Sequence, residues 1–156
     1  MITFYKGTGS LAMYPSNDRK SKDLRKLMFS FAKSTGEKAA GGRGSLIDRE
    51  STIIVGFEYL DLCRLRMWIF GALKGSTESI SFHRDLGESE KRMMNASKGK
   101  TEGTYGFTVN VTKGEEKSSV SVYLDSNELY GMMQYVDRMI NVVLDSEFVP
   151  YSTSEE

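Results

Sequence analysis

The chain has 156 residues, of which 39% are hydrophobic and 27% charged, a composition typical of one folded domain and not of a disordered segment. Its 21 basic residues balance 21 acidic residues, which excludes a uniformly basic, histone-like protein. A single cysteine, Cys63, excludes an intrachain disulfide framework, and no stretch approaches the roughly 18–20 apolar residues of a membrane span. We therefore expect a single domain without membrane association, and the first residues predict no targeting segment.

Charge is unevenly distributed along the chain. Residues 1–49 carry a net charge of +6, whereas residues 145–156 carry −4. A basic first third is compatible with a polyanionic partner. From the charge distribution alone, however, ordinary solvated surface charge is the simpler interpretation.

The first half of the chain predicts a hairpin, two further strands and a helix. Strands are indicated by period-2 alternation of apolar residues, and the helix by Leu62, Leu65 and Ile69, which recur three or four positions apart. The expected elements are a hairpin over 2–6 and 11–14 with a three-residue glycine turn 7–9, a strand over 27–32, a glycine-containing loop over 34–43, a strand over 52–57, and a helix from Leu60 to Leu73 that ends at Gly75.

The same order of elements starts again near residue 80. Residues 80–84, 107–113, 118–122 and 124–129 follow residues 2–6, 27–33, 51–55 and 57–62 in character and in order. Asp125 and Glu128 have the spacing of a capping box, which predicts the start of a second helix with its apolar stripe beginning at Leu129. The chain therefore predicts two copies of one strand–strand–strand–strand–helix unit.

Two such copies predict an α+β fold. Each copy is a curved antiparallel sheet with one helix, too small to bury the apolar stripe of that helix, so we expect two antiparallel sheets packed with a helical core. The expected domain covers 1–144, with repeat one over about 1–75 and repeat two over about 77–144. Residues 145–156 are expected to form an acidic, flexible tail, because Pro150 stops a helix and the last residues are too polar to pack.

A series of short motifs, all in order, carries a resemblance to a known family. The motifs are Phe4-Tyr5-Lys6-Gly7-Thr8-Gly9-Ser10-Leu11, Met28-Phe29-Ser30-Phe31-Ala32, Ser81-Phe82-His83-Arg84-Asp85, Glu90-Lys91-Arg92 and Tyr105-Gly106-Phe107. Together, over about residues 2–144, they resemble the Whirly family of single-stranded DNA-binding proteins, in a compact virus- or bacteria-like form. The first motif departs from the family's Lys-Gly-Lys-Ala-Ala-Leu at Thr8, Gly9 and Ser10.

The resemblance implies sequence-independent binding of single-stranded DNA in replication, recombination or repair. It implies a homo-oligomer, a tetramer or dimer, with the strand lying across sheets of adjacent subunits, in the cytoplasm of a bacterium or of an infected host cell. Two alternatives stay open: an RNA-binding or annealing factor or transcription cofactor of related architecture, and a virus-encoded factor that binds an acidic host protein. The acidic tail is an expected contact for replication or recombination proteins.

Alternation separates the two faces of each predicted sheet. In the second sheet the residues expected to face the helices are Ile80, Phe82, Phe107, Val109, Val111, Val120, Val122 and Leu124. The other face offers hydroxyls, an amide and two flat rings, a surface on which bases can stack: Ser81, His83, Thr108, Asn110, Ser119, Ser121 and Tyr123. The matching face of the first sheet is more apolar, and we expect part of it to contact another copy: Thr3, Tyr5, Met28, Ser30, Thr52 and Ile54.

Basic residues near these faces would hold phosphates without reading sequence. Lys6 and Arg84 occupy equivalent strand ends in the two repeats, and the other bases are expected in loops: Arg25, Lys26, Arg43, Arg49, Arg92, Lys98 and Lys100. The predicted nucleic-acid-binding residues are Tyr5, Lys6, Lys26, Ser30, Arg43, Arg49, His83, Arg84, Arg92, Thr108, Asn110 and Tyr123.

The sequence contains no recognisable catalytic constellation. His83 is the only histidine and Cys63 the only cysteine, which excludes a zinc site built from these ligands. Gly41–Gly44 lacks the spacing of a phosphate-binding loop, and the carboxylates fit turns and helix caps. We therefore expect a protein that is not an enzyme and that uses neither a metal nor a cofactor.

Overall fold

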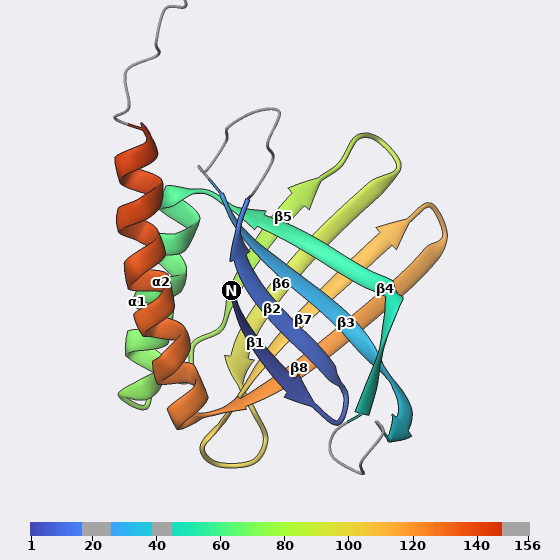
Figure 1. The fold of residues 1–156 in the computed structure, drawn as a ribbon, viewed down its shortest axis with the longest axis horizontal. Coiled ribbons are helices and arrows are strands. Elements are labelled where there is room, and N and C mark those ends of the chain that lie inside the picture. Colours follow the sequence, from blue (N-terminus) through green and yellow to red (C-terminus); the bar gives the residue numbers. More distant parts are fainter. Residues whose placement is uncertain (17–25, 39–44, 148–156) are drawn as a thin grey trace, which may run out of the picture.

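The computed structural model describes residues 1–16, 26–38 and 45–147 (Figure 1). In this part of the chain, the first repeat consists of β1 (Ile2–Lys6), β2 (Gly9–Pro15), β3 (Leu27–Lys38), β4 (Ser45–Phe57) and α1 (Tyr59–Leu73). The second repeat consists of β5 (Ile80–Asp85), β6 (Glu90–Lys98), β7 (Thr104–Lys113), β8 (Glu116–Asp125) and α2 (Ser126–Glu147). Each set of four strands forms an antiparallel sheet in sequential order, which confirms the α+β class and the predicted repeat.

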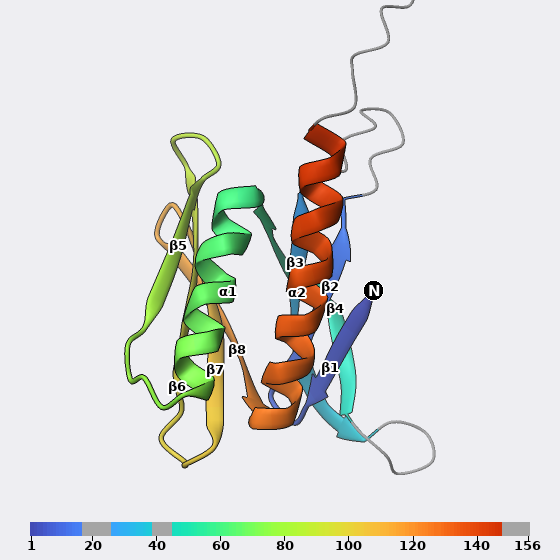
Figure 2. The ribbon, with the colours of Figure 1, turned by 90° about the vertical axis from the view of Figure 1, so that its left-hand side faces the viewer.

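The two sheets form two layers, and the two helices run side by side along one side of them (Figures 1 and 2). Each helix packs against the sheet of the other repeat. Trp68 of α1 meets the ring of Phe107 of β7 edge-on, with ring centroids 5.8 Å apart. Tyr135 of α2 donates a hydrogen bond from its hydroxyl to the carbonyl of Met13 in β2, at 3.3 Å. The helices are therefore exchanged between the repeats.

The apolar faces of the sheets fill the core as alternation predicts. Phe57, at the end of β4, lies between Phe29 of the first sheet and Phe82 of the second, with ring centroids 4.4 and 4.5 Å apart. Of the eight residues expected to face the helices from the second sheet, Ile80 and Val111 are partly buried and the other six are fully buried. Burial of this shared core joins the two repeats into one unit.

Both helices begin with a capping box, a reciprocal pair of bonds between a side chain and a backbone N–H. At α2 the Asp125 N–H donates to Glu128 and the Glu128 N–H donates to Asp125, at 3.1 and 2.8 Å, as predicted. The bond from the Glu128 N–H lowers the pKa of the Asp125 carboxyl. At α1 the equivalent pair is Glu58 and Asp61. The end of α1 at Gly75 is also confirmed, since Gly75 has a φ of 98°.

The first turn is tighter than predicted. Lys6 pairs with Gly9, so the turn contains two residues, Gly7 and Thr8, and not three. Gly9 already belongs to β2, where a Cβ atom would lie 2.4 Å from the carbonyl oxygen of Ala32 in β3. This close approach of two backbones requires glycine at position 9.

Other elements also differ from the sequence prediction. β3 continues through Lys38 and β4 begins at Ser45, so residues 34–38 are strand and not loop, while residues 39–43 of that predicted loop lie outside the described part. Sequence alternation did not place β6. Helix α2 runs through Glu147, so the first three residues of the expected tail are helical, and residues 148–156 lie outside the described part. Among the described residues no helix could span a membrane.

Candidate nucleic-acid interface

The outer face of the second sheet, turned away from the core, is polar. Strand pairing aligns its side chains into rows across the sheet. The first row contains Ser81, Asn95, Thr108 and Ser121, and the second contains His83, Met93, Asn110 and Ser119. In the first row, the Ser81 hydroxyl donates to the Asn95 side-chain oxygen at 2.6 Å, and the hydroxyls of Thr108 and Ser121 are hydrogen-bonded at 2.8 Å. The structure thus brings His83, Thr108 and Asn110 onto one face, as predicted.

Tyr123 lies at one end of this face with 47% of its surface exposed. It borders a hollow of about 550 Å³ that is also lined by Lys98 and Lys100. Gly106 lies beside the Tyr123 ring, and a Cβ atom at position 106 would be 3.1 Å from that ring. The glycine therefore leaves room for the ring to lie low over the sheet, in a hollow that Lys98 and Lys100 also line.

A second pair of lysines stands at the opposite end of the face. Lys91 and Lys117 are exposed and share a row with Thr112, together with Asp85 at the sheet edge. At about 3.3 Å per residue, Gly106 and Thr112 on β7 are about 20 Å apart. In the part of the chain that the structure describes, neither these two lysines nor the pair beside Tyr123 forms an ion pair.

The outer face of the first sheet brings together three other predicted residues. Tyr5, which is 69% exposed, lines with Ser30 and Arg49 a hollow of about 500 Å³. Arg49 belongs to β4 and not to a loop, and Arg92 and Lys98 belong to β6, so the predicted loop placement of these three bases is wrong. Arg43 lies outside the described residues.

Lys6 and Arg84 are both engaged inside the molecule, in equivalent ways. The Lys6 ammonium contacts the carboxylate of Glu128, and the Arg84 guanidinium contacts that of Asp61 at 2.5 Å. Glu128 and Asp61 are the third helical residues of the two capping boxes. The strand-end cation of each repeat thus binds the helix start of the other repeat, and the phosphate contact inferred for these cations stays a prediction.

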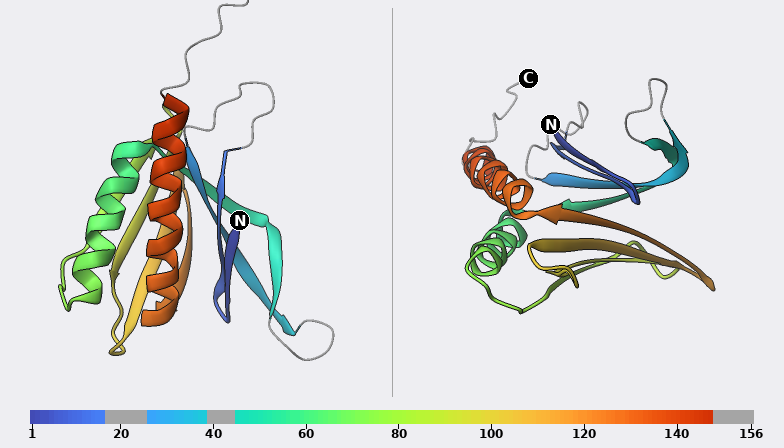
Figure 3. Two further views of the ribbon diagram at one scale, coloured as in Figure 1. Left: turned by 60° about the vertical axis from the view of Figure 1, so that its left-hand side comes forward. Right: turned by 90° about the horizontal axis from the view of Figure 1, so that it is seen from below.

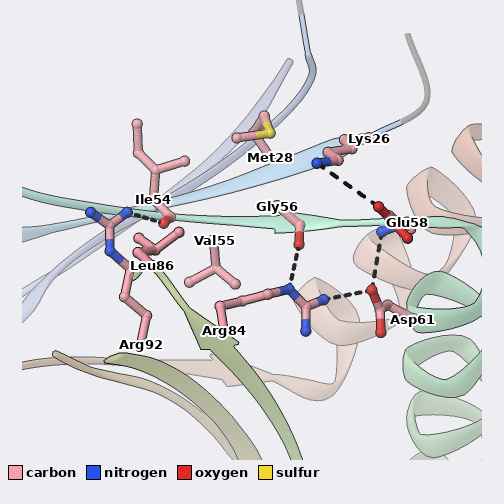
Figure 4. Close-up of a pocket in the computed structure, with 10 residues that line it drawn as sticks. All are labelled: Lys26, Met28, Ile54, Val55, Gly56, Glu58, Asp61, Arg84, Leu86 and Arg92. Carbon is pink, nitrogen blue, oxygen red and sulfur yellow. Dashed lines mark hydrogen bonds and ion pairs between the residues drawn. The ribbon is translucent and has the colours of Figure 1, made fainter. Parts of the chain in front are cut away.

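Side chains of each repeat also bond to backbone carbonyls on one edge strand of the other repeat's sheet. Arg84 donates from Nε to the carbonyl of Gly56 at 3.0 Å, and Arg92 donates to the carbonyl of Ile54 at 2.5 Å (Figure 4). Both carbonyls belong to edge strand β4. On β8, an edge strand of the second sheet, the carbonyl of Ser121 accepts a bond of 2.8 Å from the Thr8 hydroxyl. Each repeat therefore satisfies backbone groups that the other leaves without a neighbouring strand.

The cleft that these arginines line is nearly neutral. It has a volume of about 710 Å³ and lies between β4 and the start of the second sheet (Figure 4). Lys26 approaches Glu58 at 3.9 Å, while Arg84 and Arg92 bind Asp61 and Glu90. Because each cation faces an acid, this cleft is a weaker anion site than the outer faces. Among the described residues no group of three or more His, Cys, Asp or Glu side chains could hold a metal ion.

No protein-family model and no curated protein matches this chain. Solved structures do match it. WHY1 from Arabidopsis thaliana, a Whirly protein, has a TM-score of 0.72 at 16% sequence identity, covering 91% of this chain and 83% of that one. This chain has the Whirly fold. The resemblance inferred from the motifs is therefore confirmed at the level of the fold.

Two further structures share the Whirly fold with this chain. The plant transcriptional regulator PBF-2 has a TM-score of 0.68 at 14% identity, covering 94% of this chain and 82% of that one. A guide-RNA-binding protein complex bound to a guide RNA has a TM-score of 0.61 at 9% identity, covering 90% and 88%. At such identities the comparison shows the architecture alone.

Proposed function

We propose that this protein binds single-stranded nucleic acid without sequence preference, on the outer faces of its two sheets. The observation that carries this proposal is the outer face of the second sheet, where exposed Tyr123 lies at one end of a polar surface. The lysines at both ends of this face form no ion pair with any described residue. A flat ring stacks on any base, and hydroxyls both donate and accept hydrogen bonds. Lysines at both ends would hold phosphates and add affinity irrespective of sequence.

The fold comparison supports the same class of ligand. One structure of this architecture is a complex with guide RNA, and another is a plant transcriptional regulator. We propose DNA as the principal ligand, with a role in replication, recombination or repair in the cytoplasm of a bacterium or infected cell. RNA is the second candidate, because the neighbour that holds a nucleic acid holds RNA. We further propose a homo-oligomer, a dimer or tetramer, in which one strand crosses sheets of adjacent subunits.

Fluorescence anisotropy with a labelled oligothymidylate, the corresponding RNA and a duplex tests this function. We expect the single strands to bind more tightly than the duplex, and Tyr123→Ala to weaken binding about tenfold, since one stacked base is worth about 1–3 kcal/mol. Tyr130→Ala is the matched control, because Tyr130 is similarly exposed, at 51%, but lies on α2. Equal affinity for duplex and single strand, or equal loss in both variants, would contradict the proposal.

The lysines provide an independent measurement. Replacing both Lys98 and Lys100 with alanine should reduce the slope of log affinity against log salt by about 1.4, because each phosphate contact to a single strand contributes about 0.7. Substituting Lys6, which is held by Glu128, should change that slope less. A larger effect at Lys6 would place the phosphate path at the strand ends predicted from the sequence.

A further inference from the structure

We propose that the hollow on the outer face of the first sheet is a seat for one base of the bound strand. This inference rests on the proposed function and assigns that function a second contact point. The hollow has a volume of about 500 Å³ and is lined by residues from all four strands of the sheet. This volume is within the range of small-molecule sites, about 300–1,000 Å³, and leaves ample room for a flat ring.

Small side chains form the floor of this seat. Strand pairing places Ser10 of β2 beside Ala32 of β3, and Ala12 of β2 beside Ser30 of β3, so four small residues lie together. All four line the hollow. Larger side chains surround them, with Tyr5 and Tyr14 from β1 and β2 and Arg49 from β4. The difference in side-chain height makes a depression in a sheet face that would otherwise be level.

The depression is deepened by a bend in the sheet. Pairing of β3 with β4 shifts register between Phe31 and Lys33, and Ser51 and Thr52 stabilise this irregularity through bonds from their hydroxyls to the carbonyls of Asp48 and Arg49. Such irregularities bend a strand pair. The far end of β3 and the start of β4 accordingly turn away from the second sheet (Figure 3, right). This bend places Arg49 on the wall of the hollow.

Ser10 provides the observation that points to a ligand. Its side chain is on the floor of the hollow, only 7% of the residue is exposed, and its hydroxyl has no hydrogen-bond partner within the described residues. This hydroxyl oxygen opens into the hollow, because no side-chain nitrogen or oxygen among the described residues is both fully buried and without a hydrogen-bond partner, so its partner there is solvent. The donors and acceptors on a base edge would replace it. A hydroxyl can serve either kind of group, so this contact does not select one base.

The walls of the seat match the rest of a nucleotide. Tyr5, at 69% exposure, presents a ring to a base above the floor. Arg49 is exposed, and in the described ranges no carboxylate pairs with it, so its guanidinium is available to a phosphate beside the seated base. The combination of aromatic ring, free guanidinium and small polar floor favours a nucleotide over an apolar segment of another copy.

The test fills the seat without removing any charge or ring. Ala12→Leu places a bulky side chain on the floor, and Met28→Leu is the matched control, on the same outer face but outside the hollow. Binding is measured by anisotropy with an oligothymidylate and with an abasic strand of equal length, which keeps the phosphates. Circular dichroism and light scattering check the fold and the assembly mass of each variant.

We expect Ala12→Leu to weaken oligothymidylate binding about tenfold, the loss of one stacked base, and to leave abasic binding unchanged. Met28→Leu should bind both strands as the wild type does. If folded Ala12→Leu binds the oligothymidylate as the wild type does, the seat is overturned while the proposed function stands. A change in the assembly mass of Ala12→Leu also overturns the seat, because it would assign this face to contact between copies. Failure of the wild type to bind any single strand overturns the proposed function itself.

A second measurement keeps the proposal testable if Ala12→Leu does not fold. A Tyr5→Trp variant places a fluorescent ring at the wall of the seat. Oligothymidylate should quench this fluorescence, and the abasic strand should not, because quenching requires a base next to the ring. Equal fluorescence changes with the two strands would overturn the seat.

Discussion

Arg84 joins the two repeats, and replacing it tests whether it has a structural role. Its guanidinium donates to the carbonyl of Gly56 at 3.0 Å and to the carboxylate of Asp61 at 2.5 Å, and it lies over the ring of Phe57 at 5.5 Å. Arg84→Met keeps most of the side-chain stem but removes these two donors, and also the Nη1 donor that binds the His83 carbonyl at 2.7 Å. Bonds involving charged groups contribute about 1.5–3 kcal/mol each, and the pair is partly screened, with 27% and 21% side-chain exposure. We expect a loss of about 3 kcal/mol in unfolding free energy.

Thermal unfolding followed by circular dichroism measures this loss. In a domain of this size, 1 kcal/mol corresponds to about 2–4 °C, so the melting temperature should fall by roughly 6–12 °C. Lys91→Met is the control, because Lys91 is exposed on the adjacent strand and forms no ion pair with another described residue. A double-mutant cycle with Asp61→Asn isolates the pair itself.

The opposite result would refute this reasoning. If Arg84→Met melts within about 1 °C of the wild type, and instead reduces the salt dependence of single-strand binding, Arg84 contacts phosphate and its bond to Asp61 is incidental. That outcome would restore the role predicted from the sequence.

Three further predictions concern other parts of the chain. Gly9→Ala should cost about 1–3 kcal/mol by chemical denaturation, because its Cβ would lie 2.4 Å from the Ala32 carbonyl oxygen, whereas Gly7→Ala, with open space around it, should cost little. Asp125→Asn should destabilise the protein at neutral pH. Since the pKa of Asp125 is lowered from 3.8, the difference in unfolding free energy between the variant and the wild type should persist above pH 3.8 and shrink as the pH falls below it. Unfolding curves at several pH values measure this dependence. Removal of residues 148–156, with Glu155 and Glu156, should tighten single-strand binding at low salt only, if these carboxylates compete for the basic surfaces; unchanged affinity at low salt would exclude such competition.

Local signals in the sequence predicted most of the architecture. Helix α1 begins at an i, i+3, i+4 stripe and ends at Gly75, and α2 begins at the Asp125–Glu128 box, all signals contained within a few residues. The extension of β3 through Gly36 was not predicted, because glycine normally interrupts a strand and here has a positive φ of 79°. Such a residue is tolerated only because pairing with β4 continues beyond it, which is a tertiary effect.

The candidate site was less accessible to sequence reasoning, because its charges depend on partners far along the chain. Lys6 and Glu128 are 122 positions apart, and no spacing rule relates them. The repeat itself contained the missing signal: Lys6 aligns with Arg84, and Glu128 aligns with Asp61. The seat around Ser10 was not predicted for another reason. A hollow forms where small side chains are neighbours across paired strands, and the sequence does not show which strand residues are paired.

The exchange of helices between the repeats has a consequence for how the chain holds together. The helix that packs on each sheet and the cation at each helix start are supplied by the other half, as in a complex of two separate subunits. The short connection from Lys74 to Ser79 therefore acts as a tether, which fixes a high effective concentration of each half for the other. In a chain cleaved within this tether the contacts would be unchanged but their formation would depend on protein concentration, so the connection makes the stability of the fold independent of dilution.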